Sequence, residues 1–291
     1  TGARTRAIGV ETVGMTKAFG NLVALDDVSI LLTPGAFHSL LVENCACKST
    51  LVKCMMGFYQ PTSGAMLVND DEADVPNPRA AHALGIGMVY QHFTLVPSLT
   101  AAENLVIARA DAPRVIDWKA ERRALSAFLE TTPFKVPLDV PVSGLSAGEK
   151  QKLEILKQLY LDQRFLILDE PTSVLTPDEA DEVLGLLRAM TDAGDLTILM
   201  ITHKFREVTA YADDVTVLRR GRVVGSGRVG DLSVDDMSRM MIGETEIRES
   251  AERTAHHDAA LKLELAGLFA DDDEELPAIE AISLKIHAGE I

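Results

Sequence analysis

The chain has 291 residues, enough for one large domain or two modest ones, and its 28 basic and 44 acidic side chains give a formal net charge of −16. This acidic balance argues against a nucleic-acid-binding protein, which needs a basic face toward the phosphate backbone, and it supplies no polybasic patch for an anionic membrane surface. A hydrophobic fraction of 47% is compatible with a sizeable core, and three cysteines fit a reducing compartment better than a disulfide scaffold. No run approaches the ~18 apolar residues of a membrane span.

Apolar runs with strand character alternate with helical stretches along most of the chain. Several of these runs are apolar at consecutive positions, as strands buried on both faces of a parallel sheet are. The predicted strands are 37–42, 86–90, 165–168, 197–201 and 215–218. The predicted helices are 118–129, 147–161 and 177–190. The alternation predicts an α/β domain with a largely parallel sheet.

Two of the predicted helices have clear start signals. Thr176 can cap the helix that begins with Pro177, and Glu179 completes a capping box with it. Ser146 and Glu149 have the same spacing in front of helix 147–161, so they too predict a capping box.

The chain divides into segments of different character. Residues 1–244 predict one domain, in which about 97–150 form a mostly helical insert without buried strands. Residues 245–260 are polar and charged, which predicts a linker. Residues 261–291 are similar to the opening of the chain, since Ile-Glu-Ala-Ile-Ser-Leu at 279–284 matches Leu-Asp-Asp-Val-Ser-Ile at 25–30. This internal repeat predicts the truncated start of a second copy of the domain.

A candidate phosphate-binding loop lies between strand 37–42 and a following helix. It consists of Asn44, Cys45, Ala46, Cys47, Lys48, Ser49 and Thr50. In such a loop backbone amides hold the phosphates, Lys48 would neutralise the β- and γ-oxygens, and Ser49 would bind Mg²⁺. The usual glycines are missing, so an ordinary strand–helix turn stays open as an alternative. A zinc site built from Cys45, Cys47 and Cys54 lacks an evident fourth ligand.

Polar side chains follow three of the predicted strands. Asp169 and Glu170 come directly after strand 165–168, at the edge where ligands bind in open α/β sheets. Asp169 could hold magnesium through water and Glu170 could polarise an attacking water, although an acidic pair that opens the next helix is the alternative. Gln91 and His203 follow two further strands at the same edge, where a solvated polar residue is the simpler interpretation.

The order of these segments resembles the nucleotide-binding domain of ABC transporters across residues 10–242. The matching positions are Phe19, Lys48-Ser49-Thr50, Gln91, Leu145-Ser146-Ala147-Gly148-Glu149, Asp169-Glu170 and His203. The resemblance implies a P-loop NTPase (RecA-like) core with an N-terminal antiparallel β subdomain and a helical insert. It also implies ATP and Mg²⁺ as the molecules bound and ATP hydrolysis as the reaction.

The resemblance assigns a role to each matching position. Phe19 would stack on adenine, and residues 44–50 would bind the phosphates. Glu170 would be the catalytic base and His203 the switch histidine. The metal ligands would be Ser49, Gln91 and Asp169. Ser146, Ala147, Gly148 and Glu149 would form the signature helix, which faces the nucleotide held by a partner domain.

The segment Gly-Met-Val-Tyr-Gln-His-Phe at 87–93 resembles importers of simple sugars and nucleosides, which have two such domains fused in one chain. The implied partners are transmembrane permease subunits, a second ABC domain of the same chain or a homodimer, and indirectly a periplasmic or lipoprotein solute-binding protein. No nucleic acid partner is implied, and the protein would lie at the inner face of the cell membrane. The rival, a soluble ABC ATPase acting on ribosomes or DNA, is disfavoured by the acidic charge.

The phosphate loop departs from the family pattern, because Val42, Cys45 and Cys47 stand at its three glycine positions. Left-handed backbone costs a non-glycine residue roughly 1–2 kcal/mol. If two of the three positions need it, ATP binding weakens by ~30-fold to 1,000-fold. The alternative function is therefore a degenerate, regulatory half with impaired ATP binding.

Overall fold

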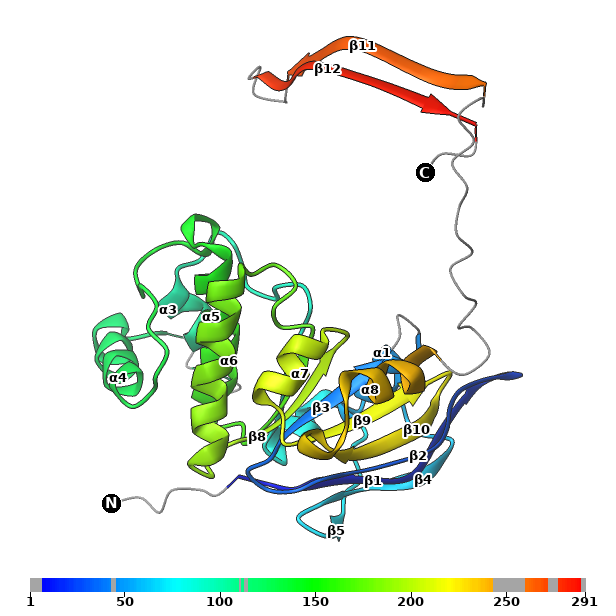
Figure 1. The fold of residues 1–291 in the computed structure, drawn as a ribbon. Coiled ribbons are helices and arrows are strands. Elements are labelled where there is room, and N and C mark those ends of the chain that lie inside the picture. The colour runs from blue at the N-terminus through cyan, green and yellow to red at the C-terminus, as the bar shows by residue number, and fades with distance from the viewer. Residues whose placement is uncertain are drawn as a thin grey trace. The chain divides into compact units, whose positions relative to one another are not determined.

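The computed structural model describes residues 7–42, 46–109, 111–112, 115–242, 260–271 and 277–288. The chain divides into two compact units, Thr1–Glu244 and Thr245–Ile291. Each unit has its own sheets, and the candidate site lies entirely in the first (Figure 1).

The first unit begins with a four-stranded antiparallel sheet in the strand order β2-β1-β4-β5. Its strands are β1 (Val10–Phe19), β2 (Leu22–Leu32), β4 (Ser63–Val68) and β5 (Asp71–Glu72). A Cβ atom at Gly64 would lie 2.4 Å from the carbonyl oxygen of Gly14, so the approach of β4 to β1 requires glycine. This sheet is the antiparallel β subdomain that the resemblance implies.

A six-stranded sheet forms the centre of the unit, in the order β10-β9-β3-β8-β7-β6. Its strands are β3 (Phe37–Val42), β6 (Ile86–Val89), β7 (Phe165–Asp169), β8 (Thr197–Thr202), β9 (Asp214–Arg219) and β10 (Arg222–Arg228). Five strands run parallel, and β10 pairs antiparallel with β9 at one edge. Every residue of β3, β6 and β8 is buried, which is why their sequences are apolar without alternation. The predicted strands are confirmed, with ends that differ by at most one residue.

Helices cover both faces of this sheet. They are α1 (Ala46–Met55), α2 (Pro78–Ala83), α3 (Ala101–Ile107), α4 (Trp118–Glu130), α5 (Ala147–Tyr160), α6 (Pro177–Asp192), α7 (Phe205–Tyr211) and α8 (Val234–Ile242). Both predicted capping boxes are confirmed, and Thr100 and Glu103 form a third at the start of α3. Among the described residues, no helix is both long enough and apolar enough to cross a bilayer.

The central sheet separates two hydrophobic cores. Leu199 of β8 packs into the core beneath the antiparallel sheet and α1. Its neighbour Met200 packs into the core that contains residues of α3, α5 and α6. These three helices and α4 lie together in the first unit (Figure 1). Of the four, α3, α4 and the start of α5 fall within the predicted insert of residues 97–150, whereas α6 lies outside it.

The second unit is a hairpin of two antiparallel strands. These are β11 (Leu261–Asp271) and β12 (Pro277–His287). In this hairpin the Gly267 amide donates to Ser283 Oγ at 3.0 Å, as the Gly14 amide donates to Ser29 Oγ at 2.8 Å between β1 and β2. Both glycines have left-handed backbone, with φ of 57° at Gly14 and 60° at Gly267. The hairpin thus repeats a local irregularity of the first one.

Candidate functional site

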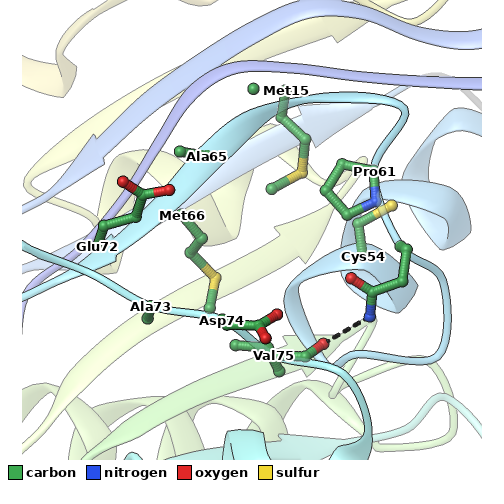
Figure 2. A pocket seen from close by; sticks show the side chains of 11 residues that line it. Met15, Cys54, Pro61, Ala65, Met66, Glu72, Ala73, Asp74 and Val75 are labelled. Carbon is green, nitrogen blue, oxygen red and sulfur yellow. Dashed lines mark hydrogen bonds between the residues drawn. The ribbon is translucent and has the colours of Figure 1, made fainter.

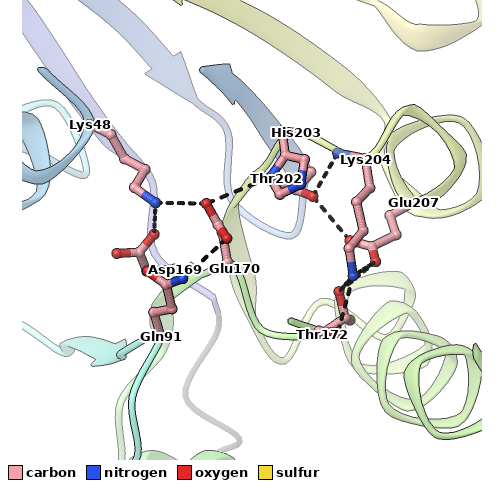
Figure 3. Close-up of polar contacts among 9 residues, drawn as sticks. All are labelled: Lys48, Gln91, Asp169, Glu170, Thr172, Thr202, His203, Lys204 and Glu207. Carbon is pink, nitrogen blue, oxygen red and sulfur yellow. Dashed lines mark hydrogen bonds and ion pairs between the residues drawn. The ribbon is translucent and has the colours of Figure 1, made fainter. Parts of the chain in front are cut away.

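The carboxyl edge of the parallel sheet brings together side chains from four separate segments (Figure 3). Lys48 lies in the first turn of α1, after β3, and Gln91 follows β6. Asp169 ends β7 and Glu170 comes next, while His203 follows β8. The structure therefore places all five of these predicted residues in one polar cluster.

The Lys48 ammonium lies between the two carboxylates. Its Nζ is 3.0 Å from Asp169 Oδ1 and 2.8 Å from Glu170 Oε1. Burial by itself would lower the pKa of Lys48, but the hydrogen bonds and charges of Glu170 and Asp169 outweigh it and raise the pKa above its usual value. Lys48 is therefore a fixed positive charge at the start of a helix, where an anionic group is favoured.

Glu170 is the centre of the cluster. Its backbone is left-handed, with φ of 48°, and its amide donates to Ile201 O in β8 at 2.9 Å. Gln91 Nε2 donates to Oε2 at 3.3 Å, and His203 Nδ1 lies 3.6 Å from Oε1. Burial would raise the pKa of Glu170, but the hydrogen bond and charge of Lys48 lower it below its usual value. The side chain is thus an ionised carboxylate that can accept a proton.

Oxygen donors for a divalent cation lie beside this cluster. Ser49, Gln91 and Asp169 line one groove of about 520 Å³, and Ser49 is exposed to it. In the part of the chain that the structure describes, no three His, Cys, Asp or Glu side chains group together to hold a metal ion. One carboxylate, a hydroxyl and an amide oxygen fit Mg²⁺, which commonly relies on one or two carboxylates and on the substrate's phosphates.

The phosphate loop corrects one prediction from the sequence. Val42 is the last residue of strand β3, and Cys47 lies in the first turn of α1, so neither has left-handed backbone. Both side chains belong to the core beneath the antiparallel sheet, with 3% and 5% of their surface exposed. The predicted backbone penalty is therefore wrong at these two positions. Thr50 is also buried. Asn44, Cys45 and the side chain of Ala46 lie outside the described residues.

Phe19 ends β1 and keeps 42% of its surface exposed. Its ring meets the edge of Tyr59, with 5.3 Å between centroids and 77° between planes. Lys17 Nζ lies 5.1 Å from the centroid of Phe19. An exposed aromatic face beside a cation can stack with a planar base. Tyr59 was not predicted from the sequence.

The signature segment forms a separate polar group at the start of α5. Ser146 Oγ accepts from the Glu149 amide at 3.2 Å, and Glu149 Oε2 accepts from the Ser146 amide at 2.9 Å. Ala147 is half-buried, and a Cβ atom at Gly148 would lie 2.5 Å from Oε1 of Glu179. The Ser146 and Glu149 side chains bond to each other's backbone amides, and the Gly148 amide donates to Glu179. Their role toward a second nucleotide stays a prediction.

A second cavity, of about 570 Å³, lies between the antiparallel sheet and α1 (Figure 2). Met15, Cys54 and Met66 line it, and Gln60 Nε2 donates to Val75 O at 2.9 Å along its wall. Burial raises the pKa of Cys54 to about 11, with only a partial offset from the charge of Lys17. The thiol is thus protonated at neutral pH.

Three residues that the sequence analysis missed lie directly behind the cluster. Thr172, Thr202 and Glu207 form a buried group of hydroxyl and carboxylate side chains (Figure 3). One signal was present in the sequence. Glu207 occupies the third position of α7, where a glutamate normally pairs with a capping Ser or Thr, but Lys204 stands at the capping position.

Comparison with known proteins agrees with this geometry. The family model described as "ABC transporter" matches residues 25–173. The nucleoside import ATP-binding protein NupA of Lactococcus lactis is 34% identical over 97% of this chain and 56% of its own length. The D-allose import ATP-binding protein AlsA of Escherichia coli is 38% identical over 80% of this chain and 47% of its own length. This chain thus spans about half the length of the curated relatives it matches.

Solved structures show the same fold. CbiO1 of Clostridium perfringens, part of an ABC transporter complex, is 26% identical, with a TM-score of 0.67 over 78% of this chain and 90% of that chain. A nucleotide-free ATP-binding cassette from an ABC transporter is 22% identical, with a TM-score of 0.69 over 82% of this chain and 100% of that chain. The fold, the polar cluster and the family match agree, and the chain belongs to the ABC transporter family.

Proposed function

We propose that the first unit binds and hydrolyses ATP as part of the ATP-binding subunit of an importer for simple sugars or nucleosides. The observation that carries the proposal is the cluster of Lys48, Asp169 and Glu170 at the carboxyl edge of the parallel sheet. A cation at a helix start beside two carboxylates at a strand end is the arrangement that binds and cleaves a nucleoside triphosphate. The importer assignment rests on relatives named for the import of nucleosides, allose and ribose.

Glu170 is the proposed base for hydrolysis. Its ionised carboxylate would accept a proton from the water whose oxygen attacks the γ-phosphorus, while the bond to the bridging oxygen breaks. His203 lies 3.6 Å from the same carboxylate and is half exposed, so it can contact the reacting end of the substrate. Lys48 pairs with Glu170, and the phosphate oxygens of a bound nucleotide would compete for its ammonium group. Substrate binding would thereby release Glu170 for its role as base.

A magnesium ion is the proposed cofactor. When bound, Mg²⁺ would neutralise charge on the transferred phosphoryl group. The Ser49 hydroxyl, the Gln91 amide oxygen and the Asp169 carboxylate are the ligands that this chain would supply. Phe19 would stack on the adenine at the other end of the nucleotide.

A second domain is the proposed partner for the signature segment. Ser146, Ala147, Gly148 and Glu149 would face a nucleotide held by another ABC domain, in the same full-length chain or in a homodimer. Residues 1–244 would form the first domain, 245–260 the linker, and 261–291 the start of the second. The glycine–serine bond shared by the two hairpins supports a repeat, and so does the greater length of the relatives.

The groove beside Gln91 is the proposed contact with a transmembrane permease. Its walls include the half-buried Phe93 and the exposed Phe58, so apolar surface lies next to polar groups, as at many contact sites. Leu95, two residues further along the chain, is buried in the helical core and does not belong to this surface. A permease contact would place the protein at the inner face of the membrane, with a solute-binding protein acting indirectly through the permease.

The test of ATP binding is calorimetric titration of the whole protein with MgATP. Lys48→Ala should weaken binding at least ~10-fold, because the phosphates lose their charged partner. Lys119→Ala, at an exposed position on α4, is the matched control and should bind as the wild type does. Equal affinities for all three proteins would refute the proposed site.

A further inference from the structure

Glu207 is a buried carboxylate behind the polar cluster. It contacts both of the segments that carry the proposed reactive residues, Glu170 and His203. Glu207, on α7, keeps only 7% of its surface exposed. Oε1 accepts a hydrogen bond from Thr172 Oγ1, and Oε2 accepts one from Thr202 Oγ1 at 3.1 Å. Lys204 Nζ lies 3.2 Å from Oε1, so both carboxylate oxygens have partners (Figure 3).

The partners of Glu207 sit next to the proposed reactive residues. Thr172 comes two residues after Glu170, and Thr202 directly precedes His203. Lys204 joins the same two segments, since its Nζ donates to Thr172 O at 3.0 Å and its amide donates to Thr202 Oγ1 at 3.1 Å. Glu207 therefore fixes the loop after β7 to the loop after β8.

The orientation of Glu207 differs from that of other glutamates at the same helix position. Glu103, Glu149 and Glu179 are each the third residue of a helix, and each closes a capping box with its own N-cap residue. Glu207 is the third residue of α7, but the N-cap Lys204 makes no side-chain cap bond. Its carboxylate contacts the Lys204 ammonium and accepts from two threonines, while the N-cap amide donates to Thr202 Oγ1 instead of to Glu207. Helix capping therefore does not account for it.

Burial of a carboxylate such as that of Glu207 is costly, and buried ionic groups often contribute less to stability than apolar packing would. They can instead hold one geometry among several. In this protein the geometry in question is the 3.6 Å distance between His203 Nδ1 and Glu170 Oε1. It depends on the left-handed backbone of Glu170. We propose that Glu207 is a positioning residue that holds Glu170 and His203 in the arrangement needed for hydrolysis. This inference rests on the proposed ATPase function.

The first test is kinetic and uses Glu207→Gln in the whole protein. Gln keeps the volume but directs an NH₂ group at one of the donors, so the two loops lose their common acceptor. We expect kcat to fall about 10-fold to 100-fold, as a displacement near 1 Å would cause, while KM for ATP stays within about twofold. Glu182→Gln, at an exposed side chain that pairs with Lys152, is the matched control and should leave both constants unchanged.

A double-mutant cycle separates positioning from general damage. If Glu207 acts through His203, then Glu207→Gln should cost much less in a His203→Ala background than in the wild type. An equal loss of kcat in both backgrounds, or an unchanged kcat in the single variant, would overturn the proposal. Should Glu207→Gln fail to fold, the pair Thr202→Val and Thr202→Ser replaces it. The serine variant keeps the hydroxyl and should keep kcat, whereas the valine variant should lose it.

A spectroscopic measurement distinguishes failure of this inference from failure of the proposed function. The imidazole resonances of His203 in the nucleotide-free protein should shift in Glu207→Gln and stay unchanged in Glu182→Gln. This readout needs no ATP hydrolysis, so it remains valid if the protein proves inactive. Unchanged His203 resonances in Glu207→Gln would overturn the positioning role by themselves.

Discussion

His38 shows how a single buried side chain links stability to pH. It lies in β3 with 5% of its surface exposed, and its Nε2 is 2.9 Å from Thr216 Oγ1. Burial lowers its pKa from 6.5 to about 4, against a smaller opposing effect of the Asp213 charge. The imidazole is therefore neutral in the folded protein at pH 7, in the strand that leads to the phosphate loop.

Because His38 is buried in its neutral form, we expect the protein to lose stability against unfolding in acid. Because the folded pKa lies below the unfolded value, the unfolded chain binds the extra proton, and stability falls as pH drops from 6.5 through 4. The difference between the two pKa values corresponds to about 3 kcal/mol. His38→Gln does not titrate, so its unfolding free energy in urea should depend less on pH by up to about that amount. Identical pH dependence in both proteins would contradict the buried neutral state.

Val42 leads to a prediction opposite to the one that the family pattern favours. A glycine there was expected to relieve left-handed backbone, but Val42 is an extended residue of β3 that packs in the core. Val42→Gly should therefore lower the unfolding free energy by roughly 2–4 kcal/mol, through lost burial and a more flexible chain. Its affinity for MgATP should change less than ~10-fold.

Urea unfolding and calorimetric titration of Val42→Gly check both statements. If Val42→Gly binds ATP at least ~10-fold more tightly without losing stability, the predicted cost of left-handed backbone at this position would be correct after all. Cys45 lies outside the described residues, so the gain expected from glycine at that position stays a prediction. The alternative function, a degenerate regulatory half with impaired ATP binding, is therefore not supported by backbone strain at Val42 or Cys47.

At the scale of elements, helix α5 is fixed to the loop after Gln91 by a buried ion pair. Glu154 is fully buried and accepts hydrogen bonds from the amide and hydroxyl of Thr94. Lys157 Nζ lies 2.6 Å from Glu154 Oε2 and donates to Thr94 Oγ1 at 2.6 Å. The signature helix and the loop that carries Gln91 are thereby held together.

Glu154→Ala should destabilise the protein by about 2–4 kcal/mol, because it deprives the largely buried Lys157 ammonium of its carboxylate and the Thr94 amide of its acceptor. Glu182→Ala is the matched control, since its ion pair with Lys152 is half exposed and should contribute less than about 1 kcal/mol. Thermal unfolding of both variants measures the difference. Equal effects on stability would contradict the role of Glu154 in joining α5 to the loop.

The elements that could be predicted from the sequence are those whose signals are local. Buried strands such as β3 have apolar runs, and α6 has its Thr176–Glu179 box, so their limits were found within two residues. Tyr59 could not be found, because its partner Phe19 comes from a distant segment. For Glu207 the only signal was the missing capping residue, because its partner Thr172 also comes from a distant segment. The same limit applies to Leu95, because the sequence of an apolar loop does not reveal whether a residue faces solvent or a core, and Leu95 faces a core.

At the scale of the whole molecule, the groove beside Gln91 predicts where a partner binds. Phe93 is half-buried in this groove, so Phe93→Ala should reduce co-purification with the permease and reduce transport. ATP affinity and melting temperature should stay nearly unchanged. Val115→Ala, at a position 87% exposed in the helical region, is the control. A fall of several degrees in melting temperature would instead identify Phe93 as a core residue.

The central claim is that the cluster at the carboxyl edge of the sheet hydrolyses ATP with Glu170 as base. The most direct test measures ATP turnover and ATP affinity of Glu170→Gln in the whole protein. The amide keeps the shape of the side chain but accepts no proton, so turnover should fall by at least ~100-fold. Affinity should stay within about threefold of the wild type. An unchanged rate of hydrolysis per site would show that Glu170 is not the base.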